Sequence, residues 1–502
     1  MSPVAPFPRT PAELPLPLLA KLDDLNPWWH NLPAPPQPAL RRWPFARLRR
    51  LLDKGIAPAT VLRGPRRVGK TVLLEQLIHQ LLADGVAPQR ILYVPFDDLP
   101  SLGALLEPVL QIPRWFEQAR LGQSFNQAAH AGQPAYLFFD EVQNLRAWAP
   151  QLKSLVDHSA VRALVTGSSS LRIAAGRDSL AGRITTLDLG PLHLREIAEL
   201  RSGHSITPYW PSNGLDPLLS PDFWRDAKRR AQAEREPRRQ AFAAFSERGA
   251  YPFAHQHPDL PWSELADYLD ETVIRRAVQH DLRTGPRGRQ RDGALIEAIF
   301  RLACRYSGQA PGPSVFVPDL RSLLGREVTW NRVLTYLRFL DDTMLLRLVP
   351  PLELRLKRQT APAKLCLADH ALRAVRMQEL VPLDPSALAA EPQLADLAGR
   401  IAEGALGYFL AIVPGLDLAH LPARADQPEV DFVLTLGTRR IPVEVKYRRK
   451  IDPFEDTRGL RVFLEKASFN APFGLLVTQE DDVTVPDPRI IPLSLSELLW
   501  LR

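Results

Sequence analysis

One segment near the start of the chain carries the residue types that bind phosphate groups. Residues 64–71 read Gly-Pro-Arg-Arg-Val-Gly-Lys-Thr and match the pattern GxxxxGK[ST]. In this pattern the glycines let backbone N–H groups surround the phosphates, Lys70 binds the β- and γ-phosphates, and the Thr71 hydroxyl binds Mg²⁺. A chance match in a basic loop is the alternative, but the segment lies between an expected strand and an expected helix. The sequence therefore predicts an ATP site that includes Gly64, Pro65, Arg66, Arg67, Val68, Gly69, Lys70, Thr71 and Val72.

A second motif downstream supplies acidic groups. The apolar run Tyr136–Phe139 is followed directly by Asp140 and Glu141. A buried strand that ends in this way would place Asp140 beside the Mg²⁺, and Glu141 could then polarise the attacking water. A later apolar strand ends at Thr166, with Ser168 close behind, and either hydroxyl could lie near the γ-phosphate. An ordinary Gly/Ser turn is the alternative interpretation of that last segment.

Arg183 is a further candidate for the nucleotide site. It stands in the segment Leu-Ala-Gly-Arg, just before an expected strand. An arginine there could respond to the state of the nucleotide in its own subunit or in a neighbouring one of a homo-oligomer. The alternative is a surface arginine with no such role.

The last part of the chain carries a separate set of polar residues. Asp431 lies in an expected strand, and Glu444 and Lys446 lie two apart in the next one, so their side chains share a face. Glu403, on the preceding helix, could be a further acidic ligand. Carboxylates and a lysine on one face could hold Mg²⁺ or Mn²⁺ and activate water for phosphodiester hydrolysis. The alternatives are a cross-strand ion pair on a solvated face, or a former nuclease site kept as a DNA-binding module.

Continuous apolar strands alternate with helices in the part of the chain that must position the phosphate loop. The expected helix is Lys70–Ala83, and the expected strands are Ala59–Arg63, Arg90–Phe96, Tyr136–Phe139, Val161–Thr166 and Thr185–Leu189. Such runs are typical of a parallel sheet covered on both faces. The expected fold class is α/β: a P-loop NTPase parallel sheet, then a helical winged-helix region, then a small α/β nuclease-like domain.

Five segments follow from these patterns. We expect a Pro-rich extended arm over 1–44, an ATPase domain over 45–200, an insertion or linker over 201–257, a helical and winged-helix region over 258–385, and the α/β domain over 386–502. Tryptophans at 28 and 29 should pack the arm onto a neighbouring domain. The winged-helix outline consists of helices at 294–307, 317–324 and 329–340 and a strand at 343–348. The Arg-rich stretch within 203–245 is either a DNA-contacting insertion or a solvated helix with local ion pairs.

The composition of the chain favours the binding of an anionic partner. The chain of 502 residues has a formal net charge of +7, which mildly favours nucleic acid. DNA contacts are predicted for Thr329, Asn331, Arg332 and Thr335, for the arginines of 283–291, and for the basic run 41–54, each with a solvated surface as its alternative. No apolar run reaches the length of about 18 residues that a membrane span needs, and two cysteines make no disulfide framework. We expect a cytoplasmic protein.

Taken in order, the motifs resemble a known family. The residues GPRRVGKT, FFDEVQNL with Trp148 downstream, VTGSSS, LAGR and GPLHLREI look like the AAA-type (AAA_14-like) P-loop ATPases that carry a C-terminal DUF4143 domain. The segments ADHALRA, EVDFVL and IPVEVKYR extend the resemblance to the end of the chain. It implies an ATPase domain, a winged-helix segment and a fold similar to the PD-(D/E)xK nucleases. The segment 203–245 departs from the family as an apparent insertion.

Two functions fit these features. The first is an ATP-hydrolysing enzyme that binds DNA and carries a metal-dependent nuclease site. The second is a nucleotide-gated regulatory switch, in which the winged helix binds DNA or a protein partner and the nuclease fold is inactive.

Overall fold

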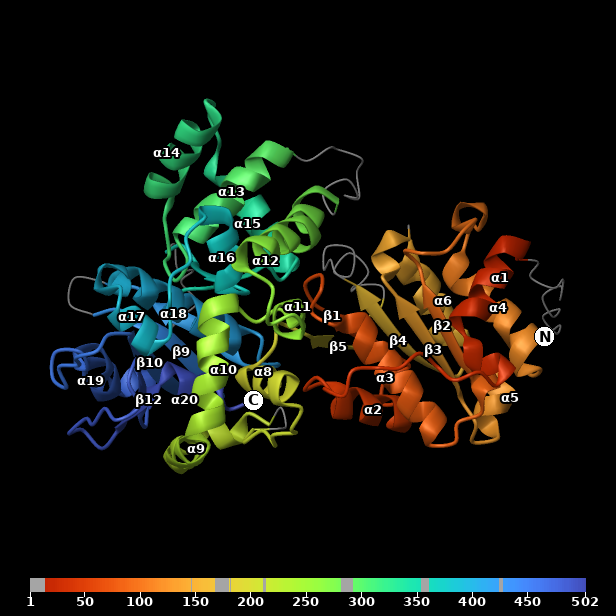
Figure 1. Cartoon of the computed structure of the whole chain (residues 1–502), viewed down its shortest axis with the longest axis horizontal. Coiled ribbons are helices and arrows are strands. Elements are labelled where there is room, and N and C mark those ends of the chain that lie inside the picture. The colour runs from red at the N-terminus through yellow and green to blue at the C-terminus, as the bar shows by residue number, and fades with distance from the viewer. Residues whose placement is uncertain are drawn as a thin grey trace. The chain divides into compact units, whose positions relative to one another are not determined.

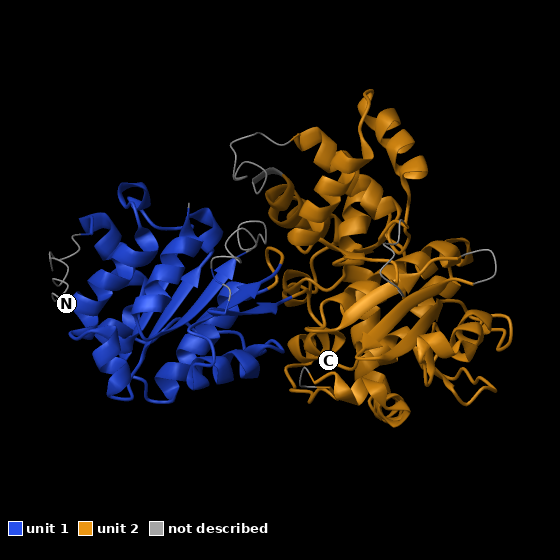
Figure 2. Cartoon of the chain, turned by 180° about the vertical axis from the view of Figure 1, so that it is seen from behind, with its two compact units in different colours: residues 1–64, 69–189 blue, residues 65–68, 190–502 orange. Residues whose placement is uncertain are grey.

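The computed structural model describes residues 14–145, 147–167, 180, 182–210, 214–280, 292–353, 361–423 and 428–502. The chain forms two compact units (Figure 2), one of residues 1–64 and 69–189, the other of residues 65–68 and 190–502. Within the described ranges, no helix is long and apolar enough to cross a membrane.

The first unit is built on a five-stranded sheet in the order β2-β3-β4-β1-β5 (Figure 1). All of its strand pairs are parallel. The strands are β1 (Ala59–Arg63), β2 (Ile91–Pro95), β3 (Ala135–Asp140), β4 (Val161–Gly167) and β5 (Ile184–Asp188). The helices of this unit are α1 (Leu16–Leu25), α2 (Phe45–Lys54), α3 (Lys70–Ala83), α4 (Pro108–Phe116), α5 (Phe125–His130) and α6 (Trp148–His158). The parallel sheet predicted from continuous apolar strands is confirmed, since β2 and β3 are buried along their whole length.

The segment before residue 45 differs from the extended arm that its prolines predict. Leu16–Leu25 forms helix α1, and Trp28 and Trp29 are buried. Both indole Nε1–H groups donate to the carbonyl of Ile91, at 3.2 and 2.9 Å, and the Asn26 side chain exchanges two hydrogen bonds with the backbone of Tyr93. Since β2 is an edge strand, these side chains provide the hydrogen-bond partners that a further strand would otherwise supply.

The first part of the second unit is helical. Its helices are α8 (Leu194–Ser202), α9 (Pro221–Ala233), α10 (Arg235–Arg248), α11 (Pro252–Gln256), α12 (Trp262–Leu269), α13 (Gly293–Arg305), α14 (Pro313–Leu324), α15 (Trp330–Asp342), α16 (His370–Met377) and α17 (Pro385–Ala389). A π-helix covers Asp270–His280. After α15, β6 (Leu346–Val349) and β7 (Lys364–Leu367) form an antiparallel pair. The three helices and the strand after them follow the order predicted from the sequence, although β6 begins at Leu346 rather than at residue 343.

The Arg-rich stretch forms helices α9 and α10. The sequence predicts either a DNA-contacting insertion or a solvated helix with local ion pairs here, and neither description fits it in full. Arg225 and Arg229 make local ion pairs with Asp222 and Asp226, as a solvated helix would. Arg238, however, is fully buried and binds both carboxylate oxygens of Asp481, 243 residues away, at 2.9 and 2.8 Å. The segment is therefore an integral part of the second unit, which the local charge pattern could not reveal.

The chain ends in a mixed five-stranded sheet in the order β12-β11-β10-β9-β8. Its strands are β8 (Asp417–Leu421), β9 (Val430–Leu436), β10 (Arg439–Lys446), β11 (Gly474–Thr478) and β12 (Ile490–Ser494). The pairs β8–β9 and β9–β10 are antiparallel, whereas β10–β11 and β11–β12 are parallel. Helices α18 (Ala395–Ala411), α19 (Arg458–Glu465) and α20 (Leu495–Leu499) accompany this sheet. A small α/β domain at this position is what the sequence predicts.

Candidate active site

The phosphate loop joins β1 to α3. Gly69 adopts a φ of +95°, which favours glycine, and α3 begins at the next residue. Lys70 is only 4% exposed, and its ammonium group donates to the carbonyl oxygen of Gly64 at 3.0 Å. The lysine side chain therefore lies along its own loop, where bound phosphates would meet it.

Three polar residues from three elements meet at the carboxyl ends of the strands. The Thr71 hydroxyl donates to Oδ2 of Asp140 at 2.7 Å, and the Thr166 hydroxyl donates to Oδ1 of the same carboxylate. In the sheet, β4 lies between β1 and β3. Thr166 therefore falls between the phosphate loop and Asp140, the position that the sequence indicates for it.

Glu141 is held beside this group by the backbone. It has a φ of +54°, its backbone N–H donates to the Thr166 hydroxyl at 3.0 Å, and its carboxylate accepts a hydrogen bond from the amide of Gln143. One carboxylate oxygen lies 3.8 Å from the ammonium of Lys70. A left-handed conformation at a non-glycine residue is uncommon, and such conformations cluster at functional sites.

Asp140 is 2% exposed, and burial together with the neighbouring Glu141 raises its pKa to about 6. Sequence reasoning missed one neighbour. The hydroxyl of Tyr93, on β2, lies 3.4 Å from Oδ2 of Asp140. A tyrosine inside an apolar strand gives no local signal of this contact, because Asp140 lies 47 positions further on.

The donor set fits Mg²⁺. A carboxylate and a hydroxyl, both oxygen donors, meet at the first turn of α3, and oxygen donors are the ligands that Mg²⁺ prefers. Thr71 and Asp140 are the residues that would hold the ion.

Arg183 does not join this group. It precedes Ile184, which pairs with Ala59 at the beginning of β1, whereas the phosphate loop follows the other end of β1. Its guanidinium forms an ion pair with Asp157. A role for Arg183 at the nucleotide of its own unit therefore does not fit the sheet geometry. Ser168, the other candidate, lies outside the described residues.

The C-terminal sheet brings the second set of candidates together. Glu403 lies on α18, Asp431 on β9, and Glu444 and Lys446 on β10. Oδ2 of Asp431 accepts the Val445 N–H at 2.8 Å, and the Lys446 ammonium donates to Oε1 of Glu444 at 2.6 Å. The helix and the two strands thus converge as predicted from the sequence.

A residue that sequence reasoning missed lies among these carboxylates. The ammonium of Lys364, on β7, donates to Glu403 and lies 3.2 Å from Oδ1 of Asp431 and 3.6 Å from Glu429. Burial alone would lower the pKa of Lys364, but the carboxylates of Asp431 and Glu403 raise it. Lys364 stands in a short apolar strand, far from these partners in sequence, so no spacing pattern points to it.

The pKa values of the carboxylates in this cluster shift in different directions. Burial and the Asp431 charge raise the pKa of Glu403, and the same two causes raise the pKa of Glu444 to about 8. Burial opposes ionisation of Asp431 too, but Lys364 and the Val445 N–H lower its pKa. In the part of the chain that the structure describes, no three His, Cys, Asp or Glu side chains are placed to hold a metal ion. The prediction of a metal bound by Glu403, Asp431 and Glu444 therefore does not fit this arrangement.

The predicted DNA contacts on α15 lie on the surface. Thr329, Asn331, Arg332 and Thr335 are all exposed near the beginning of the helix. The Arg332 guanidinium forms an ion pair of 3.1 Å with Asp292. The arginines of 283–291 lie outside the described residues.

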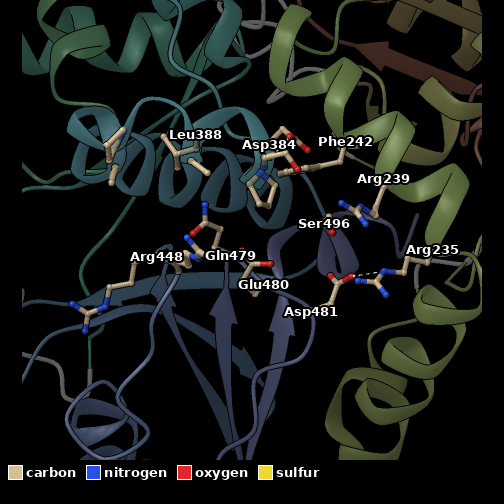
Figure 3. A pocket seen from close by; sticks show the side chains of 16 residues that line it. Arg235, Arg239, Phe242, Asp384, Leu388, Arg448, Gln479, Glu480, Asp481 and Ser496 are labelled. Atoms are coloured by element: carbon tan, nitrogen blue, oxygen red, sulfur yellow. Dashed lines mark hydrogen bonds and ion pairs between the residues drawn. The ribbon is translucent and has the colours of Figure 1, made fainter.

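A polar pocket of about 380 Å³ opens elsewhere in the second unit (Figure 3). Arg235 and Arg239 approach it from α10, and the loop after β10 contributes Arg448 and Arg449. Arg235 lies 3.6 Å from Asp481. The pocket combines four arginines with acidic groups, so it is polar rather than uniformly basic.

Comparison with known proteins agrees with this architecture at both ends of the chain. Residues 57–198 match a family model described as an AAA domain, and residues 415–496 match the domain of unknown function DUF4143. The two segments are thus similar to an AAA domain and to DUF4143, and both matches fall where the resemblance of the motifs places them.

Relatives match about half of this chain. The uncharacterized protein Rv2008c of Mycobacterium tuberculosis is 29% identical over 253 residues, which cover 47% of this chain and 50% of that protein. The uncharacterized protein MJ1637 of Methanocaldococcus jannaschii is 24% identical, over 49% and 50%. The match thus spans about half the length of these relatives. Among solved structures, the Walker-type ATPase PABY2304 of Pyrococcus abyssi gives a TM-score of 0.40 at 15% identity, over 68% of this chain and 98% of that one.

Proposed function

We propose that this chain binds ATP with Mg²⁺ and hydrolyses it. The observation that supports the proposal is that five residues meet at the carboxyl ends of the strands. They are Lys70, Thr71, Asp140, Glu141 and Thr166. Lys70 would bind the β- and γ-phosphates and the Glu141 carboxylate would accept a proton from the attacking water. Thr166 would hold Glu141 and Asp140 in place. Mg²⁺, when bound, neutralises the charge that develops on the phosphates.

DNA is the proposed macromolecular partner. Three features support this: the net positive charge of the chain, the exposed polar residues at the start of α15, and the four arginines of the polar pocket in the second unit. In this proposal a winged helix is formed by α13, α14, α15 and the β6–β7 pair. The chain then consists of the five segments that the sequence predicts.

The test is the steady-state ATPase rate with and without single-stranded, duplex and branched DNA. The Lys70→Ala variant serves as the blank. Lys54→Ala, on the surface of α2, is the matched lysine control for the rate without DNA, because the run 41–54 is itself a predicted DNA contact. We expect a rate that Lys70→Ala abolishes and that one DNA form stimulates. A rate equal in wild type and Lys70→Ala would refute the assigned site. A genuine ATPase rate that no DNA form changes would refute the DNA partner and leave the ATPase.

The nucleotide-gated switch is the second candidate, and one observation favours it. Lys364 and Lys446 engage the carboxylates that a nuclease would need for its metal. The nuclease interpretation predicts DNA cleavage with Mg²⁺ or Mn²⁺ that Lys446→Ala abolishes. The switch predicts no cleavage, together with a limited-proteolysis pattern that changes between ATP and ADP.

A further inference from the structure

The buried carboxylate cluster of the C-terminal domain contains its own cation. Lys364 is 1% exposed, and its ammonium group contacts the carboxylates of Glu403, Asp431 and Glu429. The same group lies 5.1 Å from the centre of the Phe432 ring, whose face also attracts a cation. An ammonium group has three hydrogen atoms to donate, and Lys364 donates to Glu403 and Asp431, while Glu429 at 3.6 Å adds a third negative charge.

Each carboxylate oxygen of Asp431 also has a contact. Oδ1 faces Lys364 at 3.2 Å, and Oδ2 accepts the Val445 N–H at 2.8 Å. Divalent metals such as Mg²⁺ bind carboxylates through oxygen lone pairs, and each oxygen of Asp431 keeps a second one. A metal bound to Oδ1 would therefore lie next to the ammonium group of Lys364.

Glu444 presents the opposite case. Oε1 accepts a hydrogen bond from Lys446, whereas Oε2 is buried without a hydrogen-bond partner. A buried carboxylate oxygen without a partner is costly, and it is an available ligand. One available oxygen does not make a site for Mg²⁺, which demands near-octahedral coordination.

We infer that the ammonium group of Lys364 replaces the divalent cation at this cluster and excludes metal from it. A metal ion beside Asp431 would lie next to a buried ammonium group, and two cations in contact inside a protein repel strongly. The network instead joins β7 to α18 and β9 as a buried polar cross-link. The C-terminal domain then has no metal-dependent cleavage of phosphodiester bonds at this cluster. This inference does not depend on ATP hydrolysis.

The experiment measures binding of Mn²⁺ alone to the full chain, without nucleotide, by electron paramagnetic resonance. Any Mn²⁺ bound by the wild type should be unaffected by Glu444→Gln, because the wild type has no site there. The Lys364→Met variant should bind one more Mn²⁺ than the wild type. Its affinity for this ion at the carboxylate cluster should be at least tenfold higher than that of the wild type. Lys364→Met/Glu444→Gln should lose that gain. Lys450→Gln, which changes an exposed lysine of the same domain, should behave as wild type.

Two outcomes would overturn the inference. The first is wild-type Mn²⁺ binding that Glu444→Gln removes. The second is a folded Lys364→Met variant, verified by circular dichroism, that gains no Mn²⁺. If Lys364→Met does not fold, the comparison of wild type with Glu444→Gln decides alone.

Discussion

The hydroxyl of Thr71 donates to Oδ2 of Asp140 at 2.7 Å, across 69 positions of sequence. This bond joins the first turn of α3 to the end of β3, so the two halves of the proposed nucleotide site are in direct contact.

Replacing Glu141 by Gln should leave ATP binding close to wild type and reduce hydrolysis at least 100-fold, because an amide cannot accept the proton of the attacking water. Single-turnover hydrolysis and equilibrium binding of a fluorescent ATP analogue separate the two effects. Glu107→Gln, an exposed change in the same unit, is the control. Hydrolysis at the wild-type rate in Glu141→Gln would remove this residue from its assigned role.

Thr166→Val should slow hydrolysis at least tenfold and reduce the free energy of unfolding by about 1–2 kcal/mol. Valine keeps the shape but leaves the Asp140 carboxylate and the Glu141 N–H without their shared partner. Thr166→Ser keeps the hydroxyl and should restore most of both quantities. Equal rates in the valine and serine variants would show that the hydroxyl does not position these acids.

Arg183→Ala should change ATP turnover by less than about twofold in dilute protein. The residue lies at the amino ends of the strands, roughly 15 Å along β1 from the phosphate loop. The turnover number is measured over a range of protein concentrations. A loss above tenfold that grows with concentration would show instead that Arg183 acts on a neighbouring subunit of a homo-oligomer.

Arg238→Ala should destabilise the second unit by about 3–5 kcal/mol, because it leaves the Asp481 carboxylate without its buried partner. Urea unfolding followed by tryptophan fluorescence measures the loss. Arg239→Ala, an exposed neighbour on the same helix, should cost less than about 0.5 kcal/mol. Similar losses in the two variants would contradict a special role for the buried pair.

His255 should make the second unit less stable in acid. Burial lowers its pKa to about 4, whereas the unfolded chain would titrate near 6.5. The unfolded state therefore binds more protons between these values, and this contribution to stability is lost as pH falls. His255→Gln should remove about 2 kcal/mol of the difference between pH 7 and pH 5, measured by urea unfolding. Gln256→Ala, an exposed change at a neighbouring residue that does not titrate, is the control.

The elements around the phosphate loop could be predicted from the sequence because their signals are local. Ala59–Arg63 and Lys70–Ala83 form β1 and α3 at the expected boundaries. Lys364 and Arg238 could not be predicted, because neither belongs to a motif that links it to its partner Asp431 or Asp481, whereas Thr71 and Asp140, 69 positions apart, each belong to one. Charge patterns report neighbours along the chain, whereas a buried ion pair depends on how distant elements meet.

The hydrogen bonds of Asn26, Trp28 and Trp29 with β2 have a consequence for solubility. An exposed edge strand is a template on which a strand from another molecule can add, and this is a common route to aggregation. Two indoles and one amide occupy the positions that such a strand would take. The N-terminal segment thus protects the sheet of the first unit from self-association at its β2 edge.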